Sequence, residues 1–191
     1  MSKNLNIKIH PSTHAAAIAL CCGALFTSGL TGCSTVSSAK LSHYEEAERI
    51  GNEHLAAFDT LDFDVYTNQK WERFSESHAK DILVHYPDGH TTKGLDAHIE
   101  ELKPMFVFAP DTRIRTHPVR IQSGDWTSVI GVMEGTFTKP MPAAAGKTIP
   151  PTGKAFKLEM CTVGHWKDGV MDEEYLFWDN LAFMKQIGLA P

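Results

Sequence analysis

Hydrophobic positions follow helix-like spacing in the first half of the chain and strand-like runs in the second half. The early pattern predicts helices over residues 42–61, 64–78 and 94–108. A short strand over residues 81–86 is predicted before the last of these helices. After Pro110 the pattern predicts four long strands and a closing helix, over residues 112–122, 126–138, 154–167, 170–178 and 180–189 (helix). Helices followed by an antiparallel meander are typical of an α+β domain.

The late strands carry hydrophobic residues on both faces. Ile130 and Val132 lie on one face of a predicted strand, and Val129 and Met133 lie on the other. In the last strand, Leu176 likewise lies on the face opposite to that of the apolar residues before and after it. A sheet with one face in water would alternate more cleanly between apolar and polar residues. We therefore expect a curved sheet with a pocket on its concave face and a cover on its convex face. A second copy of the chain, forming a homodimer, is one candidate for that cover.

The N-terminus has the features of an export signal. Lys3 and Lys8 precede an apolar run over residues 15–30, which is short for a membrane span. The run ends in Leu30-Thr31-Gly32-Cys33, which resembles a bacterial lipobox. This resemblance implies a lipoprotein signal over 1–32, a diacylglycerol on Cys33, and a protein anchored in the bacterial envelope. In a bacterium with two membranes, we expect the periplasmic face of the outer membrane. Residues 33–41 then form a tether, and residues 42–191 the folded domain.

The charge balance makes a nucleic acid an unlikely partner. The chain holds 18 basic and 23 acidic residues, for a net charge of −5. Without the two basic residues of the leader the balance is 16 against 23, or −7. No cluster of basic residues remains that could hold a phosphate backbone.

Candidate acid–base groups gather in and beside the last strand. Glu173 and Glu174 are adjacent, so their side chains point to opposite faces and one of them enters any cavity there. Asp179 sits where the strand meets the closing helix, as either an acid–base group at the cavity mouth or the helix N-cap. His85 lies on an apolar strand and is either a proton shuttle or a core residue bonded to backbone.

The sequence predicts no metal site and no cofactor. The histidines are scattered, and those at positions 78, 85, 90, 98, 117 and 165 form no closely spaced pair. A zinc site needs three or four converging ligands, which this spacing does not indicate. The chain also lacks a phosphate-binding glycine loop and a G-x-S-x-G nucleophile motif.

Several short motifs together resemble one family. These are His85-Tyr86-Pro87-Asp88-Gly89, Gly135-Thr136, residues 149–154, Asp168-Gly169, Glu173-Glu174, Trp178-Asp179 and residues 185–188. In this order they are similar to the SnoaL-like family of the nuclear-transport-factor-2-like superfamily, over about residues 45–189. The resemblance implies a cone-shaped, curved antiparallel sheet with N-terminal helices, a short C-terminal helix and a deep apolar cavity. It also implies polyketide-cyclase, isomerase, dehydratase or hydrolase chemistry.

The resemblance also bears on individual residues. It favours Glu174 as the cavity carboxylate, on the same face as Asp172 and Leu176. Leu176 stands where the polyketide cyclases have their acid–base Asp, and Phe137 stands where the family often has His. Leu cannot transfer a proton, so cyclisation of the usual kind is not expected from that position.

Three functions remain open. The first is a lipoprotein that binds a small apolar or aromatic molecule, the second an isomerase, cyclase or dehydratase that uses Glu174, Asp179 and His85. The third is a module that docks an envelope protein on the convex face. For a pocket we expect aromatic and polar lining residues from the strands and the turn after 85, namely Tyr86, Trp126, Phe137, Thr162, Trp166, Tyr175 and Trp178.

Overall fold

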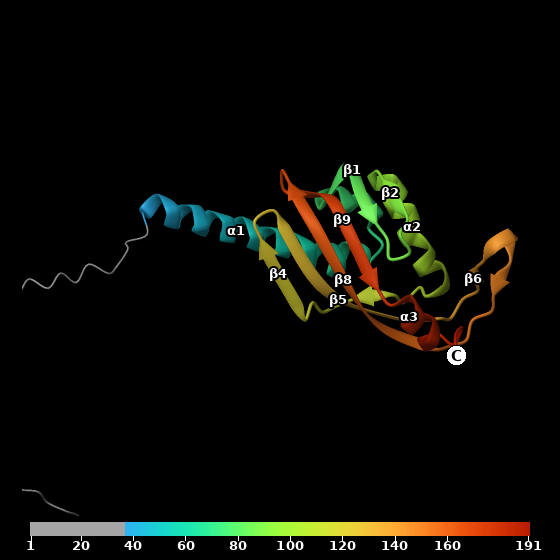
Figure 1. The fold of residues 1–191 in the computed structure, drawn as a ribbon. Coiled ribbons are helices and arrows are strands. Elements are labelled where there is room, and N and C mark those ends of the chain that lie inside the picture. The colour runs from blue at the N-terminus through green and yellow to red at the C-terminus, as the bar shows by residue number, and fades with distance from the viewer. Residues whose placement is uncertain (1–36) are drawn as a thin grey trace, which may run out of the picture. The chain divides into compact units, whose positions relative to one another are not determined.

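The computed structural model describes residues 37–191, which form one α+β unit (Figure 1). The signal segment and Cys33 lie outside these residues. The elements are, in order, α1 (Ser38–Thr60), η1 (Leu61–Tyr66), η2 (Trp71–Glu76), β1 (His78–His85), β2 (Thr91–Lys93), α2 (Leu95–Phe108), β3 (Arg113–Ile114), β4 (Val119–Ser123), β5 (Trp126–Thr136), β6 (Met141–Pro142), η3 (Ala144–Gly146), β7 (Thr148–Ile149), β8 (Ala155–Lys167), β9 (Val170–Trp178) and α3 (Asn180–Gln186). None of the helices in this part of the chain is both long and apolar enough to cross a membrane.

The main sheet has the strand order β2-β1-β9-β8-β5-β3, and β4 also pairs with β5. The long strands β5, β8 and β9 form an antiparallel meander, as the sequence predicts. One pair of strands in this mainly antiparallel sheet runs parallel, namely β1 and β9. Parallel strands need a long crossover, and the chain between β1 and β9 supplies it. This pairing brings residues from both ends of the domain to one wall.

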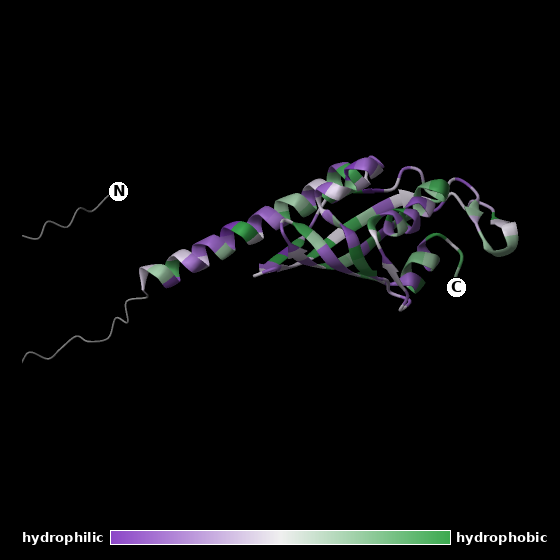
Figure 2. Cartoon of the chain, turned by 90° about the horizontal axis from the view of Figure 1, so that it is seen from above, coloured by the Kyte–Doolittle hydropathy of each residue, from purple (hydrophilic) through white to green (hydrophobic). Residues whose placement is uncertain are grey.

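The helices lie on one side of the sheet (Figure 1). α1 begins at Ser38, where Ser37 caps it, so residues 38–41, expected in the tether, are helical. Its first turns are exposed and project beyond the sheet, where purple and pale segments predominate in Figure 2. Its last turns bury Leu55 and Phe58 against the domain. The core therefore lies between the sheet, the end of α1, and α2.

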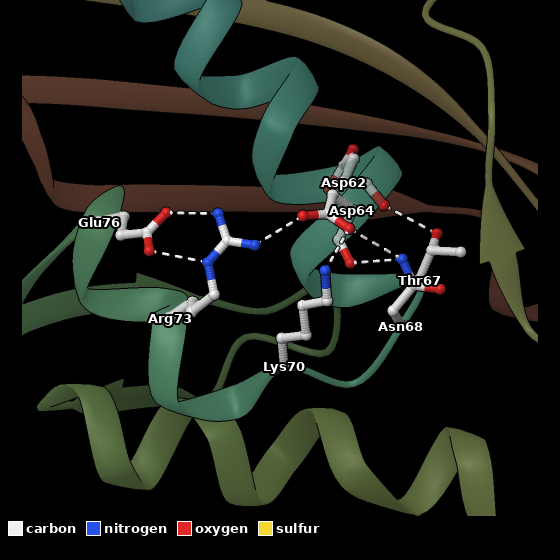
Figure 3. A network of polar contacts seen from close by, with 7 residues as sticks. All are labelled: Asp62, Asp64, Thr67, Asn68, Lys70, Arg73 and Glu76. Atoms are coloured by element: carbon white, nitrogen blue, oxygen red, sulfur yellow. Dashed lines mark hydrogen bonds and ion pairs between the residues drawn. The ribbon is translucent and has the colours of Figure 1, made fainter.

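The region predicted as a second helix over 64–78 is instead two short helices joined by a turn. Gln69 has a φ of 55°, a left-handed conformation that interrupts a helix. Asp64 forms ion pairs with Lys70 and Arg73, each at 2.6 Å, and Arg73 also pairs with Glu76 (Figure 3). These contacts hold the turn against η1, and the two cations lower the pKa of Asp64 to about 2.

The strand predicted over 112–122 is also divided, into β3 and β4. Pro118, which lacks a backbone N–H, lies between them with Thr116 and His117. The irregular segment turns His117 inward against the carboxylates of Asp59 and Asp62. The segment 139–152, between two of the predicted strands, contains the small hairpin β6–β7.

A bulge in β9 decides which of its acids face inward. The pairing with β8 shifts between His165 and Trp166, so Met171 and Glu174, three residues apart, are both buried. Asp172 therefore bonds His165 at 2.6 Å on the outer side. The expectation that Asp172 shares a face with Glu174 is wrong, because a bulge reverses the alternation of side chains.

Candidate functional site

A cavity of about 370 Å³ lies between the sheet, η1, the end of α1, and α2. This volume is within the usual range of small-molecule pockets, about 300–1,000 Å³. Most of its wall is apolar, formed by residues such as Phe58, Leu61, Phe74, Phe108, Ile114, Met133, Leu158, Leu176 and Phe183. Exposed residues at one end, including Asp88, His90 and Asn180, mark the opening. The cavity thus suits a small, mainly apolar molecule.

Glu174 and two histidines form a polar cluster in the cavity wall. Nε2 of His98 lies 3.4 Å from Oε2 of Glu174, and Nε2 of His78 lies 3.8 Å from the same oxygen. All three side chains are at most 5% exposed. We call His78, His98 and Glu174 the Glu174 cluster. Its three residues come from β1, α2 and β9, which the parallel β1–β9 pair and α2 bring together.

The far nitrogen of each imidazole in the Glu174 cluster is held by a partner. Nδ1 of His98 lies 2.9 Å from the hydroxyl of Tyr86. Nδ1 of His78 lies 2.9 Å from Oγ of Ser77 and 3.2 Å from the carbonyl oxygen of Phe74. These contacts orient both rings with Nε2 toward Glu174. Within residues 37–191, His78 Nε2 and Glu174 Oε2 have no hydrogen-bond partner, although both are buried.

Burial shapes the electrostatics of the Glu174 cluster. It lowers the pKa of His98 to about 4, against a smaller opposing effect of Glu174, so the imidazole is neutral near pH 7. For Glu174, burial raises the pKa of the carboxyl, but the two imidazoles together lower it further than burial raises it. Burial also raises the pKa of the Tyr86 hydroxyl to about 12, which keeps it protonated. The cluster therefore combines a carboxylate with a neutral imidazole at His98.

A second buried histidine group reaches the cavity through Asp62, one of the lining residues. His117 lies 2.8 Å from Asp62 through Nε2 and 2.7 Å from Asp59 through Nδ1. Asp59 also pairs with Arg120, which is exposed. We call Asp62, His117 and Asp59 the His117 relay. It connects the cavity to the surface through hydrogen bonds.

The His117 relay holds protons tightly. Burial alone lowers the pKa of His117, but its bonds to Asp62 and Asp59 raise it above the ordinary value. Burial also raises the pKa of Asp62, against the opposing bond from His117. Only a protonated imidazole can donate to both carboxylates at once. Burial thus favours the protonated form of Asp62, as it does for carboxyl groups that act as general acids or bases.

The family model for SnoaL-like polyketide cyclases matches residues 58–187. The chain belongs to the SnoaL-like polyketide cyclase family. This range includes every residue of the Glu174 cluster and the His117 relay. No curated protein matches this SnoaL-like chain in sequence.

Solved structures of similar proteins agree with the fold. A candidate SnoaL-like polyketide cyclase from Jannaschia sp. CCS1 is 20% identical, with a TM-score of 0.63, covering 74% of this chain and 96% of its own. IdmH from Streptomyces antibioticus, a candidate polyketide cyclase, is 22% identical, with a TM-score of 0.60 and coverages of 71% and 98%. A protein of ketosteroid isomerase-like fold from Catenulispora acidiphila, solved with trimethylamine, is 13% identical, with a TM-score of 0.55 and coverages of 72% and 93%. The expected fold class, a curved sheet with helices, is confirmed.

The structure separates the three candidate acid–base residues. Glu174 faces the cavity, whereas Glu173 faces the other side of the sheet and lies 2.9 Å from His85. His85 also stacks on Tyr175 there, so it does not share a site with Glu174. The carboxylate of Asp179 accepts a hydrogen bond from the backbone N–H of Ala182, as the N-cap of α3.

The expected lining residues divide in the same way. Tyr86, Thr162 and Trp178 line the cavity. The remaining four lie elsewhere: Trp126 and Tyr175 on the outer face beside His165 and His85, Trp166 under His54, and Phe137 in the core against Phe108. Leu176, which stands where related cyclases have an acid, forms part of the apolar wall.

Four site residues were missed from the sequence: His78, His98, Asp62 and His117. The sequence pattern predicts a helix up to residue 78, which includes His78, and a continuous strand through His117. One available signal was the heptad-like position of His98 on the apolar side of its helix, among Leu95, Ile99 and Leu102. A histidine on such a face must find a buried partner, and it does so in Tyr86.

Proposed function

We propose that this protein binds a small apolar compound carrying a carbonyl group and moves a proton to or from it. The observation that carries the proposal is an apolar cavity in which a carboxylate with raised pKa, Asp62, and a polar cluster around Glu174 both line the wall. Membership of the SnoaL-like family supports the same class of chemistry. In this scheme Asp62 is the proton acceptor, and the Glu174 cluster binds the polar end of the compound.

The His117 relay supports the assignment to Asp62. A carboxyl group that has accepted a proton must pass it on before the next reaction. His117 can accept that proton from Asp62 at Nε2 as it releases the proton on Nδ1 to Asp59, whose carboxylate reaches the surface beside Arg120. Proton transfer by a positioned side chain typically contributes about 10²–10⁴-fold to a rate.

The test is the exchange of carbon-bound hydrogen with solvent. We would incubate full-length protein in deuterated water with 2-acetylnaphthalene, an apolar methyl ketone, and follow its methyl protons by NMR. Removal of a methyl proton by Asp62 leaves the bonding electrons on the enolate, which takes a deuteron from solvent when it reverts to ketone. We expect exchange above the buffer rate, falling at least about 100-fold in Asp62→Asn.

The matched control is Asp172→Asn, which changes a carboxylate on the outer face of the same sheet. It should leave the exchange rate unchanged. Exchange at the buffer rate with wild-type protein would contradict the proposed function. So would an Asp62→Asn variant, folded by circular dichroism, that exchanges as fast as wild type.

The location of the protein is a further part of the proposal. The sequence 1–33 supports export and lipid attachment at Cys33, which would tether the cavity domain to an envelope membrane through the segment before α1. Labelled palmitate should be incorporated into the wild-type chain and not into Cys33→Ala. Equal labelling of the two chains would contradict the lipid anchor.

The outer face of the sheet supports self-association as a homodimer. Val119, Ile121, Trp126 and Phe177 are exposed there. They lie on neighbouring strands, since Val119 pairs with Ile130, Ile130 with Cys161, and Cys161 with Phe177. Sedimentation should give the mass of two chains for wild type and of one chain for Phe177→Asp. A wild-type mass of one chain would remove the dimer.

A further inference from the structure

We propose that His78, His98 and Glu174 bind one divalent transition-metal ion of the zinc type, with an open coordination position facing the cavity. The three residues are far apart in the chain and belong to three different elements, so their spacing does not indicate such a site. The role of the ion in a reaction rests on the function proposed above. Binding of the ion to the three residues does not depend on that function.

The distances fit a metal site. Each of the three side chains offers one ligand atom, and these atoms all lie within 4.8 Å of one another. Two ligands about 2.1 Å from a zinc ion at the tetrahedral angle are about 3.4 Å apart. The separations from Glu174 Oε2 are 3.4 Å to His98 and 3.8 Å to His78. Small side-chain rotations would therefore suffice to seat an ion among the three.

These separations do not fit a hydrogen-bonded cluster. A hydrogen bond between nitrogen and oxygen spans about 2.7–3.2 Å. Glu174 Oε2 and His78 Nε2 are buried with no such partner within residues 37–191. An unpartnered buried carboxylate is costly. A cation at the centre of the cluster would satisfy the carboxylate and both imidazoles at once.

The surrounding contacts are those of metal-binding histidines. A ligating imidazole usually has its other nitrogen bonded to a nearby group, which fixes the ring orientation and the lone pair that meets the ion. His98 has Tyr86 in this role, and His78 has Ser77 and the Phe74 carbonyl. A hydrogen bond from Nδ1 of His78 to that carbonyl leaves Nε2 with its lone pair directed at the cluster.

The set of ligands points to a reactive site. Two histidines and one glutamate are the protein ligands of several catalytic zinc sites, which keep the fourth position for water or substrate. Here all three ligands line the cavity, so that position would face the bound compound. An ion there would polarise a carbonyl oxygen, which assists removal of a proton from the neighbouring carbon. This would give the cluster a role complementary to that of Asp62.

The experiment measures metal binding directly. Full-length, untagged protein is stripped with a chelator and titrated with Co²⁺, whose visible absorption reports four-coordinate nitrogen and oxygen ligation, and then with Zn²⁺ in competition. We expect one Co²⁺ per wild-type chain, displaced by one Zn²⁺. Glu174→Gln keeps the shape of the side chain but removes the carboxylate ligand. The affinity for Co²⁺ should therefore fall at least about 100-fold, more than the loss that is usual when a group supporting a ligand is removed.

The matched control is Glu173→Gln, one residue along β9, which alters a His–Glu pair on the opposite face. It should bind Co²⁺ as wild type does. A second variant, Tyr86→Phe, leaves all three ligands in place and should weaken binding about 10–100-fold by removing the support of His98. No stoichiometric Co²⁺ in wild type, or equal affinity in Glu174→Gln and Glu173→Gln, would overturn the proposal.

These outcomes are separable from those of the exchange experiment. Metal binding that depends on Glu174, without any ketone exchange, would keep the site and remove the proposed reaction. Exchange that depends on Asp62 in chelator-treated protein without metal would keep the reaction and remove the ion's role in it, while the Co²⁺ titration alone decides whether the ion binds.

Discussion

Two buried groups of histidine and carboxylate face one cavity, and they differ in how completely their polar atoms are paired. In the His117 relay both ring nitrogens lie within 2.8 Å of a carboxylate oxygen. In the Glu174 cluster the closest approach of a ring nitrogen to the carboxylate is 3.4 Å, and two buried atoms have no partner within the described residues. The same residue types thus form a fully hydrogen-bonded network in the His117 relay. In the Glu174 cluster they leave two buried polar atoms unpaired within the described residues.

This difference suggests a division of roles. A fully paired group stabilises the fold and transmits protons, because each atom already has its partner. An incompletely paired buried group costs stability, and such a cost is tolerated mainly where a ligand supplies the missing partner. We therefore expect substitutions in the two groups to change the free energy of unfolding in opposite directions.

The largest effect is expected for His117→Leu. It leaves Asp59 and Asp62 without their shared cation, and breaking a buried pair in this way costs about 3–5 kcal/mol. Urea denaturation followed by circular dichroism measures the loss. The control is His165→Leu, which removes a histidine from a partly exposed pair with Asp172 and should cost at most about 1 kcal/mol. Equal losses in the two variants would mean that the relay does not stabilise the fold.

Glu174→Leu should have a smaller effect of the opposite sign. Glu174 Oε2 makes no hydrogen bond within the described residues, so replacing this side chain by an apolar one of similar size should be neutral or stabilising by up to about 2 kcal/mol. The measurement is the same denaturation, on protein stripped of metal so that ligation does not contribute. A loss of several kcal/mol would show that Glu174 is already well paired in the folded chain and would remove the contrast between the groups.

The smallest effect is a pH dependence that belongs to the relay. Folding raises the pKa of His117 above its ordinary 6.5. Its contribution to stability is therefore complete below pH 6.5 and is lost as the pH rises through the raised native pKa. The raised pKa of Asp62 acts in the same direction from its ordinary 3.8 upward. The melting temperature should thus fall above pH 6.5, and less steeply in His117→Gln. Identical slopes would contradict this assignment.

The fold could be predicted from the sequence because its signals are local. The alternation of apolar residues in the long strands, and turns such as Asp168-Gly169, specify the meander without any knowledge of distant contacts. The parallel pairing of β1 with β9 could not be read in this way. It joins segments that are far apart in the chain, and no turn between them fixes their direction.

The site was harder to predict because it depends on irregular structure. Of the three acid–base candidates, the structure puts only Glu174 at the cavity, while His85 lies on the outer face and Asp179 caps a helix. A bulge in β9 and a break before β4 decide which polar residues turn inward. Neither has a strong signature in the sequence, and both histidine groups are assembled across several elements.

The most direct test of the contrast is X-ray diffraction at the zinc absorption edge, from crystals of the protein grown with zinc chloride. We expect one strong anomalous peak about 2.1 Å from Nε2 of His78, Nε2 of His98 and a carboxylate oxygen of Glu174, and none at the fully paired His117. A map without that peak, with Glu174 in direct hydrogen bonds to both imidazoles, would contradict the account.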